Sequence, residues 1–153
     1  VSIIFDINDS EKMRVNANGH VTMPNQPSCS VARSSGQGSG SIEWNHVHHN
    51  TGNHFSTSTY RFTAPVAGNY LVTLFGMSNS SNTTMDREVK VNGNQQNQLV
   101  PYENANGATL HQVSGSSVIG LSANDYLTVH VNTGSWYGGT NGRHNNFSVH
   151  LLS

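Results

Sequence analysis

Apolar and polar residues alternate with a period of two along most of this chain, and almost no segment shows a helical period. In residues 3–7 every second side chain is apolar, which predicts a half-buried β-strand. A polar turn at 8–11 follows it. Asn18-Gly19, at the centre of the segment 13–23, is a strong β-hairpin signal, and Pro24 and Pro27 are expected to end that hairpin because proline has no N–H to donate.

The alternation continues in short blocks separated by turns rich in Asn, Ser and Gly. The Ser/Gly-rich segment 34–41 is expected to be a loop, and no internal repeat interrupts the series. Many short strands with polar turns indicate an all-β sandwich or jelly roll. Further strands are predicted near residues 41–47, 58–63, 69–77, 86–92, 108–121, 125–132 and 145–152.

Length and composition narrow the possible classes of protein. A chain of 153 residues fits one main domain, and Val, Ile, Leu, Phe, Tyr and Trp arrive in regular blocks, which favours a folded chain over a disordered one. Only 10% of the residues are charged and the net charge is −1, so the basic surface that nucleic-acid binding needs is not expected. No apolar run approaches the ~20 residues of a membrane span, so no membrane insertion is predicted.

The single cysteine and the first residues of the chain predict the state of that cysteine and the extent of the parent protein. Cys29 is the single cysteine, which excludes an internal disulfide and predicts a small buried hydrophobic residue. The chain starts at Val1 and lacks the charged-then-apolar plan of a signal peptide, so we expect it to be part of a longer protein.

Catalytic motifs are not found in the sequence. It has no nucleophile-elbow, zinc-protease, phosphate-binding or dinucleotide-binding pattern. Asp86 and Glu88 share one face of a predicted strand, and a glycosidase pair is one interpretation of them. Two solvated strand residues on either side of Arg87 are the favoured interpretation, and the protein is predicted not to be an enzyme.

A set of apolar, aromatic and turn residues stands at fixed spacings, and its most specific part lies in the segment 55–74. The positions of the set are Ile42, Trp44, Asn50, Gly52, Phe55, Phe62, Pro65, Gly68, Tyr70, Leu121, Asp125, Phe147, Leu151 and Leu152. The set resembles the signature of the complement C1q globular-head domain, a relative of the tumour necrosis factor (TNF) fold, and the resemblance covers residues 27–153. It implies an all-β jelly-roll sandwich that forms a homotrimer. Tyr60, Asn124 and Val149 stand where the family usually has glycine.

The segment 13–28 resembles the joint that precedes the distal domain of bacteriophage tail or head fibres. We therefore divide the chain into a hairpin stem at 1–26 and a globular head at 27–153. The resemblance implies that the rest of a fibre lies N-terminal to Val1, that the hairpins of three chains pair with one another, and that the protein is located at the fibre tip of a virion.

Histidines are numerous, nine in all, and two of them suggest a metal. His46 and His48 share one face if their segment is extended, and three such pairs on a threefold axis would offer six nitrogens to a transition-metal ion. Ordinary exposed imidazoles on a turn are the alternative interpretation. No other cofactor is implied, and calcium is not supported because the acidic residues are not clustered.

The glycine-rich segment 134–144 is the best candidate for recognition, because its backbone is free and its side chains suit a sugar. One of its two adjacent aromatic residues is expected to pack inward. The candidate binding residues are Trp136, Tyr137, Asn141, Arg143 and His144, with Tyr102 as a weaker one. The residues expected to build the core or the trimer axis are Trp44, Phe62, Tyr70, Val72, Leu74, Tyr126, Phe147 and Leu151.

These patterns lead to one main hypothesis and two alternatives. The main one is a non-catalytic, trimeric, receptor-binding domain at the end of a phage fibre, which adheres to a glycan or protein of the host surface. The first alternative is a structural cap that registers the trimer of the fibre. The second is a secreted complement-like lectin or ligand.

Overall fold

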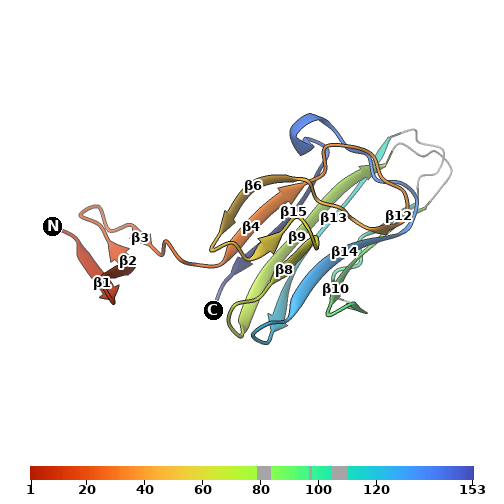
Figure 1. Cartoon of the computed structure of the whole chain (residues 1–153). Coiled ribbons are helices and arrows are strands. Elements are labelled where there is room, and N and C mark those ends of the chain that lie inside the picture. The colour runs from red at the N-terminus through yellow and green to blue at the C-terminus, as the bar shows by residue number, and fades with distance from the viewer. Residues whose placement is uncertain (79–83, 97, 105–109) are drawn as a thin grey trace.

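The computed structural model describes residues 1–78, 84–96, 98–104 and 110–153, which form a two-layer β-sandwich with a small separate sheet beside it (Figure 1). The only helical element among these residues is a one-turn 3-10 helix, η1 (Thr140–Gly142). In the described part of the chain, no helix has the length and apolar character that crossing a membrane requires. The all-β expectation is confirmed.

The small sheet is the N-terminal stem. It joins β1 (Ile3–Ile7), β2 (Ser10–Val15) and β3 (Val21–Thr22) in an antiparallel order. The predicted hairpin is present between β2 and β3, where Gly19 takes the positive φ of +81° that its turn requires. A connector of five residues, 23–27, then leads to the sandwich, so the predicted boundary between 26 and 27 lies at the end of this connector.

One layer of the sandwich is a five-stranded antiparallel sheet, with the order β13-β9-β15-β4-β6. The two longest strands, β9 and β13, pair along their whole length, from Gly68 with Leu121 to Ser78 with His111. The strands are β4 (Ser28–Ala32), β6 (His46–Thr51), β9 (Gly68–Ser78), β13 (His111–Leu121) and β15 (Asn145–Leu151).

The other layer has seven strands and is centred on the pair β10–β14. Its main path is β11-β10-β14-β8-β7, while β12 also pairs with β10 and β5 with β14. The strands are β5 (Gly40–Ser41), β7 (Phe55–Ser56), β8 (Arg61–Thr63), β10 (Thr84–Val91), β11 (Asn94–Gln95), β12 (Tyr102–Asn104) and β14 (Tyr126–Thr133).

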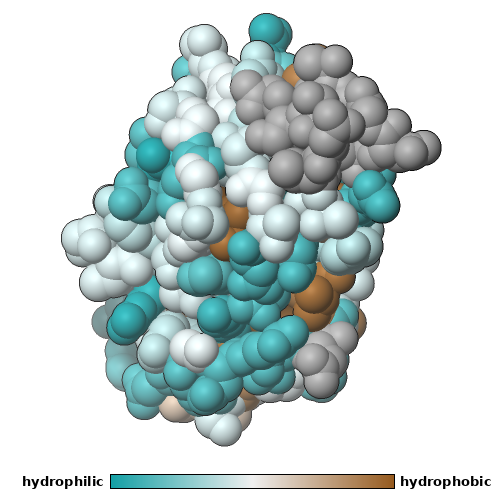
Figure 2. Space-filling model, turned by 90° about the vertical axis from the view of Figure 1, so that its right-hand side faces the viewer, coloured by the Kyte–Doolittle hydropathy of each residue, from teal (hydrophilic) through white to brown (hydrophobic). Residues whose placement is uncertain are grey.

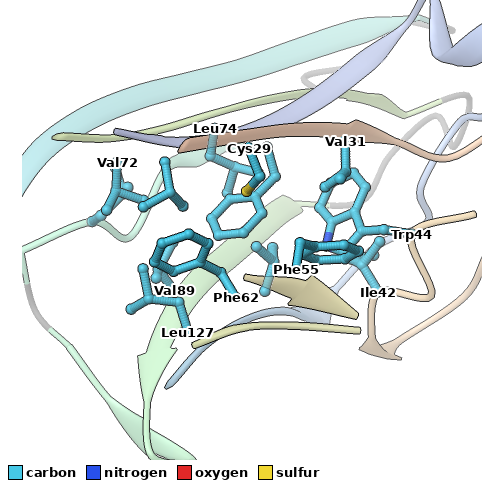
Figure 3. Packing of buried hydrophobic residues seen from close by; sticks show 14 of the residues in the cluster. Cys29, Val31, Ile42, Trp44, Phe55, Phe62, Val72, Leu74, Val89 and Leu127 are labelled. Carbon is cyan, nitrogen blue, oxygen red and sulfur yellow. The ribbon is translucent and has the colours of Figure 1, made fainter. Parts of the chain in front are cut away.

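Alternation along the strands builds the core between these two layers (Figure 3). In β9 the buried apolar side chains are Tyr70, Val72 and Leu74, while the residues between them face outward. Trp44, Phe62 and Phe147 are also fully buried, so these six predicted core residues lie where expected. The apolar area removed from water by such a cluster is the main favourable contribution to folding.

Two residues predicted for the core lie at its margin. Leu151 is partly buried and packs against the cluster. Tyr126 begins β14 with its side chain partly exposed, and its ring stacks under the guanidinium of Arg61, whose Cζ lies 4.1 Å from the ring centroid. Leu127 takes the inward position instead, because adjacent residues of a strand point to opposite faces.

The strand predictions need two substantial corrections. Residues 41–47 are not one strand, because the chain crosses from one layer to the other there, with Ile42 N–H donating to Val129 O and Asn45 N–H to Ala32 O. Strand β4, which follows Pro27 immediately and lies between β15 and β6, was not predicted. Short strands β7, β11 and β12 were also missed, and residues 108 and 109 of the predicted strand 108–121 lie outside the described residues.

The three departures from the family pattern have different structural consequences. Tyr60 and Asn124 both adopt left-handed backbone, with φ of +57° and +71°, in turns that glycine would satisfy without strain. Val149 lies instead in regular strand β15, buried and paired with Val72 and Cys29. A valine at this position therefore needs no unusual backbone conformation.

Cys29 faces the core from β4, as its single occurrence predicted. Burial raises the pKa of its thiol to about 12. A hydrogen bond between this thiol and the backbone of Val149 lowers the pKa, but this effect is the smaller one. Since the thiolate is the reactive form, we expect native protein to resist alkylation by iodoacetamide at pH 8 and denatured protein to react fully. Mass spectrometry before and after addition of guanidinium chloride measures this, and rapid labelling of the native protein would contradict the burial.

Candidate functional site

The sandwich has two distinct ends, and the chain enters and leaves at the same one. The N-terminal connector reaches this base through Gln26, whose Nε2 donates to Leu151 O at 3.0 Å. The C-terminal Ser153 O accepts from Asn69 N–H beside the start of β9. The glycine-rich segment 134–144 lies at the opposite, distal end, where Tyr137 N–H donates to Met77 O near the end of β9 (Figure 1).

Trp136 lies beneath the glycine-rich segment and not on its surface. Its side chain is only 1% exposed, and its ring meets Trp44 edge-on with centroids 5.4 Å apart. Gly76 leaves the space for this ring, because a Cβ atom there would lie 2.4 Å from Trp136 Cη2. Direct stacking of Trp136 on a ligand, which the sequence suggested, does not fit this placement, so Trp136 is the aromatic residue that packs inward.

A buried arginine holds the beginning of the segment in place. Arg87 comes from β10, and its guanidinium donates to the carbonyl oxygens of Thr133 and Ser135. Its Cζ lies 5.4 Å from the Trp136 ring centroid, a cation–π contact. Burial lowers the pKa of Arg87 to about 10, against the opposite effect of Asp86, so the group stays charged at neutral pH.

Asn145 fixes the other end of the segment. It is fully buried, accepts from Arg33 N–H at 2.6 Å, and donates to the carbonyl oxygens of Arg33 and Tyr137 at 3.0 and 3.1 Å. One side chain thus ties the segments 33–37 and 134–144 together. These roles of Asn145 and Arg87 were not predicted, because a polar residue in a strand shows no local sign of burial.

Four of the predicted binding residues lie close together on the distal surface. Asn141 and Arg143 are exposed, and Tyr137 and His144 are partly exposed with ring centroids 5.1 Å apart. Figure 2 views the molecule from the right-hand side of Figure 1 and shows, outside the grey atoms, a mostly polar surface with small apolar patches. The described residues form no pocket.

Tyr102 comes from β12, next to Asp86 of β10, and its side chain is 65% exposed. No described contact joins it to Tyr137 or Arg143.

Glu88 is buried and forms an ion pair with Lys90 at 2.8 Å. The expectation that Asp86 and Glu88 are both solvated is therefore wrong for Glu88. The burial of this side chain depends on tertiary contacts, which the local sequence does not reveal.

His46 and His48 are both in β6, so the extended conformation that the metal hypothesis needs is present. Their ring centroids lie 4.7 Å apart in an edge-on arrangement. Within the described parts of the chain, no three His, Cys, Asp or Glu side chains are grouped closely enough to hold a metal by themselves. Metal binding by this pair on a trimer axis therefore stays a prediction.

Two facing β-sheets, a core shared between them and polar connections at the distal end define a C1q/TNF-like jelly-roll domain. The family model of the C1q domain matches residues 28–152, and the chain belongs to the C1q domain family. Domains of this C1q/TNF-like class are generally ligand-binding domains without enzymatic activity. No curated protein matches the sequence.

Solved structures of low sequence identity share this fold. The globular domain of the zebrafish complement 1qA protein has a TM-score of 0.66 at 17% identity, over 84% of this chain and 98% of its own. The Eiger TNF of S. frugiperda has a TM-score of 0.69 at 12% identity, over 84% and 94%. Murine APRIL has a TM-score of 0.66 at 11% identity, over 83% and 99%. At these identities the likeness concerns the fold.

Proposed function

We propose that this chain is the non-catalytic, trimeric, receptor-binding end of a bacteriophage fibre, which adheres to a glycan of the host surface. The observation that carries the proposal is the position of the glycine-rich segment relative to the stem. The stem reaches the base of the sandwich, whereas Asn141, Arg143 and the Tyr137–His144 ring pair lie at the opposite end. Residues at that end would face away from a fibre and toward a cell.

Assembly of three copies is supported by the outward face of the five-stranded sheet. In the strands of this sheet, no Lys, Arg, Asp or Glu points outward among the described residues. Leu71, Phe75 and Met77 are partly buried there in a single chain. A neutral face with apolar side chains suits contact with other copies, because no charge would need to be desolvated. Trimers are typical of the family, and three weak sites on one tip would bind through their combined effective concentration.

Exchange of Arg143 tests the binding role directly. We expect Arg143→Ala to lower both the adsorption to host cells and the glycan-array signal, and Tyr137→Ala to lower them further. Each lost contact of about 1.4 kcal/mol should weaken the affinity about tenfold. Arg61→Ala is a matched control, because Arg61 is also exposed but lies on β8 beside Tyr126, near the base. Equal binding by all three variants and the wild type, with unchanged melting temperature, would remove the distal surface from recognition.

A second candidate function, the registration of the three chains of a fibre, is favoured by the stem. Ile3, Phe5 and Ile7 of β1 are 53–61% exposed, and Val21 of β3 is 53% exposed. A three-stranded sheet with this exposure is marginal alone, so the stems of three chains would cover one another and register the fibre. Deleting residues 1–26 separates the two roles. Lost trimers support registration by the stem, and intact trimers that still adsorb to host cells support a receptor-binding head that needs no stem.

Location at the tip of a virion belongs to the same proposal. A secreted complement-like lectin would share the fold and the open distal surface. A parent reading frame among virion structural genes supports the fibre, and one that encodes a signal peptide supports the lectin.

A further inference from the structure

Four asparagine–glycine pairs occur in the sequence, and asparagine before glycine is the arrangement in which the side-chain amide is lost most readily without an enzyme. The reason is steric, because glycine has no Cβ to keep its backbone nitrogen away from the preceding side chain. Three pairs, which begin at Asn18, Asn92 and Asn141, lie among the described residues, and the fourth, 106–107, lies outside them.

The reaction requires the peptide between the two residues to rotate. The glycine nitrogen must reach the side-chain carbonyl carbon of the asparagine. The glycine must therefore be free to move, and the asparagine side chain must not be held elsewhere. A turn in a region of low local stability meets these conditions more readily than a turn packed on a core.

Asn92 is held at both ends of its side-chain amide. Its Nδ2 donates to Asp125 Oδ1 at 2.7 Å, and its Oδ1 accepts from Tyr126 N–H at 3.0 Å. Both bonds must break before the Gly93 nitrogen can reach the amide carbon. Asn92 is therefore protected in the folded head.

Asn141 is protected by the glycine that follows it. The Asn141 side chain is exposed, but Gly142 is buried, and its N–H donates to Gly139 O at 2.7 Å. Gly142 also lies directly against Ala32 of β4. Rotation of the peptide would therefore lift Gly142 from the sandwich.

Asn18 meets both conditions. It lies in the turn between β2 and β3, where Asn18 and Gly19 are both exposed. The turn is held by Asn16, whose Oδ1 accepts from the N–H groups of Asn18 and His20 at 2.9 and 3.0 Å, while no described residue forms a hydrogen bond with the Asn18 side chain. No atom lies within 4 Å of the place that a Cβ of Gly19 would occupy. The peptide can therefore rotate without displacing a neighbour, at the cost of the hydrogen bond from Gly19 N–H to Asn16 O.

We infer that Asn18 is a site of spontaneous deamidation, and that the reaction opens the hairpin of the stem. The Gly19 nitrogen bonds to Asn18 Cγ, the bond between Cγ and the amide nitrogen breaks, and ammonia leaves a cyclic succinimide. Water then opens this ring. Cleavage of the new bond to Cγ gives aspartate, and cleavage of the original peptide bond gives isoaspartate, whose main chain runs through the former side chain. One water is consumed and one ammonia is released.

Isoaspartate lengthens the turn by a methylene group and adds a negative charge. Strands β2 and β3 pair only at Arg14–Thr22 and Val15–Val21, and the length of a hairpin turn fixes the register of its strands. We therefore expect β3 to detach from β2. The turn contains none of the apolar side chains by which the stems of three chains would cover one another, so contact between stems leaves Asn18 accessible. The chemical step itself does not depend on the proposed function of the head.

Incubation of the whole chain in mildly alkaline, isotopically labelled water, followed by peptide mapping, measures the reaction at each pair. We expect labelled aspartate and isoaspartate at residue 18, with rates at Asn92 and Asn141 at least about tenfold lower, because these two react only after local or global opening. The same incubation in guanidinium chloride is the internal control, in which all three pairs should react at similar rates. Reaction of folded Asn92 or Asn141 as fast as Asn18, or no product at residue 18, would overturn the inference.

Asn18→Gln is the matched variant for the effect on the hairpin. Glutamine keeps an uncharged amide in the turn, but it would have to form a larger and less favourable ring. After equal incubation, hydrogen exchange at the amides of β3 should become faster in the wild type and stay unchanged in Asn18→Gln. Equal acceleration in both would show that the hairpin opens for another reason. Neither measurement depends on adsorption to a host, so the receptor-binding proposal is tested separately.

Discussion

Trp44→Ala is expected to lower the free energy of unfolding by about 3–5 kcal/mol. Trp44 is fully buried where the chain crosses between the two layers, and its ring packs edge-on against Trp136 and stacked against Phe147 at 5.8 Å. Its removal leaves a cavity beside two aromatic partners that cannot collapse into it, because both are held by their own strands and segments. Guanidinium chloride denaturation followed by far-UV circular dichroism measures the loss.

Two further variants show whether the loss arises from this cavity. Trp44→Phe keeps an aromatic ring at the site and should lose clearly less than Trp44→Ala. Tyr102→Ala removes an aromatic side chain that is 65% exposed and should stay within about 0.5 kcal/mol of the wild type. A loss below about 1 kcal/mol for Trp44→Ala would contradict the packing described for the Trp44–Trp136–Phe147 cluster.

Gly142→Ala is expected to destabilise the head by about 2–4 kcal/mol, although it adds a single methyl group. Gly142 has a φ of +69°, which L side chains rarely adopt, and a Cβ atom there would lie 2.0 Å from the Cβ of Ala32. Ala32 belongs to the central strand β4 and is fully buried, so it cannot move aside easily. We therefore expect the segment 134–144 to lift from the sandwich, with faster hydrogen exchange at the Tyr137 amide.

Gly93→Ala separates the two causes of this effect. Gly93 has a similar φ of +80°, but its nearest neighbour would be the Tyr126 hydroxyl at 3.6 Å, an ordinary contact. The Gly93→Ala variant should therefore lose only about 1–2 kcal/mol of its free energy of unfolding, the cost of placing an alanine in left-handed backbone. A double-mutant cycle with Ala32→Gly then measures the overlap itself. Equal losses for Gly93→Ala and Gly142→Ala, and no coupling to Ala32, would contradict the close packing of the segment on β4.

Much of the fold follows from local patterns of residues. Period-two alternation located β1, β9, β13, β14 and β15, since the two faces of a strand differ in polarity wherever one face is buried. The pair Asn18-Gly19 identified the stem hairpin, because few residues accept the backbone of such a turn. The spaced signature between Ile42 and Leu152 indicated the jelly roll, and the apolar positions in and around it indicated six of the buried core residues.

The candidate site was only partly predictable. Sequence located the distal segment and its exposed Asn141 and Arg143, since glycine and polar residues mark turns. Adjacent aromatic residues in a segment point to opposite sides, but alternation alone does not say which one points inward. The space that Gly76 leaves by lacking a Cβ is filled by the ring of Trp136, and Gly76 is distant from Trp136 in the sequence.

By itself, the sequence determined that this protein is an all-β chain with a hairpin stem, a jelly-roll head and one buried cysteine. These are consequences of side-chain order along single strands and turns. Tertiary structure alone decided the burial of Arg87 and Glu88, the brace made by Asn145, and the meeting of His49 with His150 across β4. Each of these depends on which parts of the chain lie side by side. Neighbours across a sheet can be far apart in sequence, as His150 of β15 and Ser28 of β4 are, and no local pattern reaches that far.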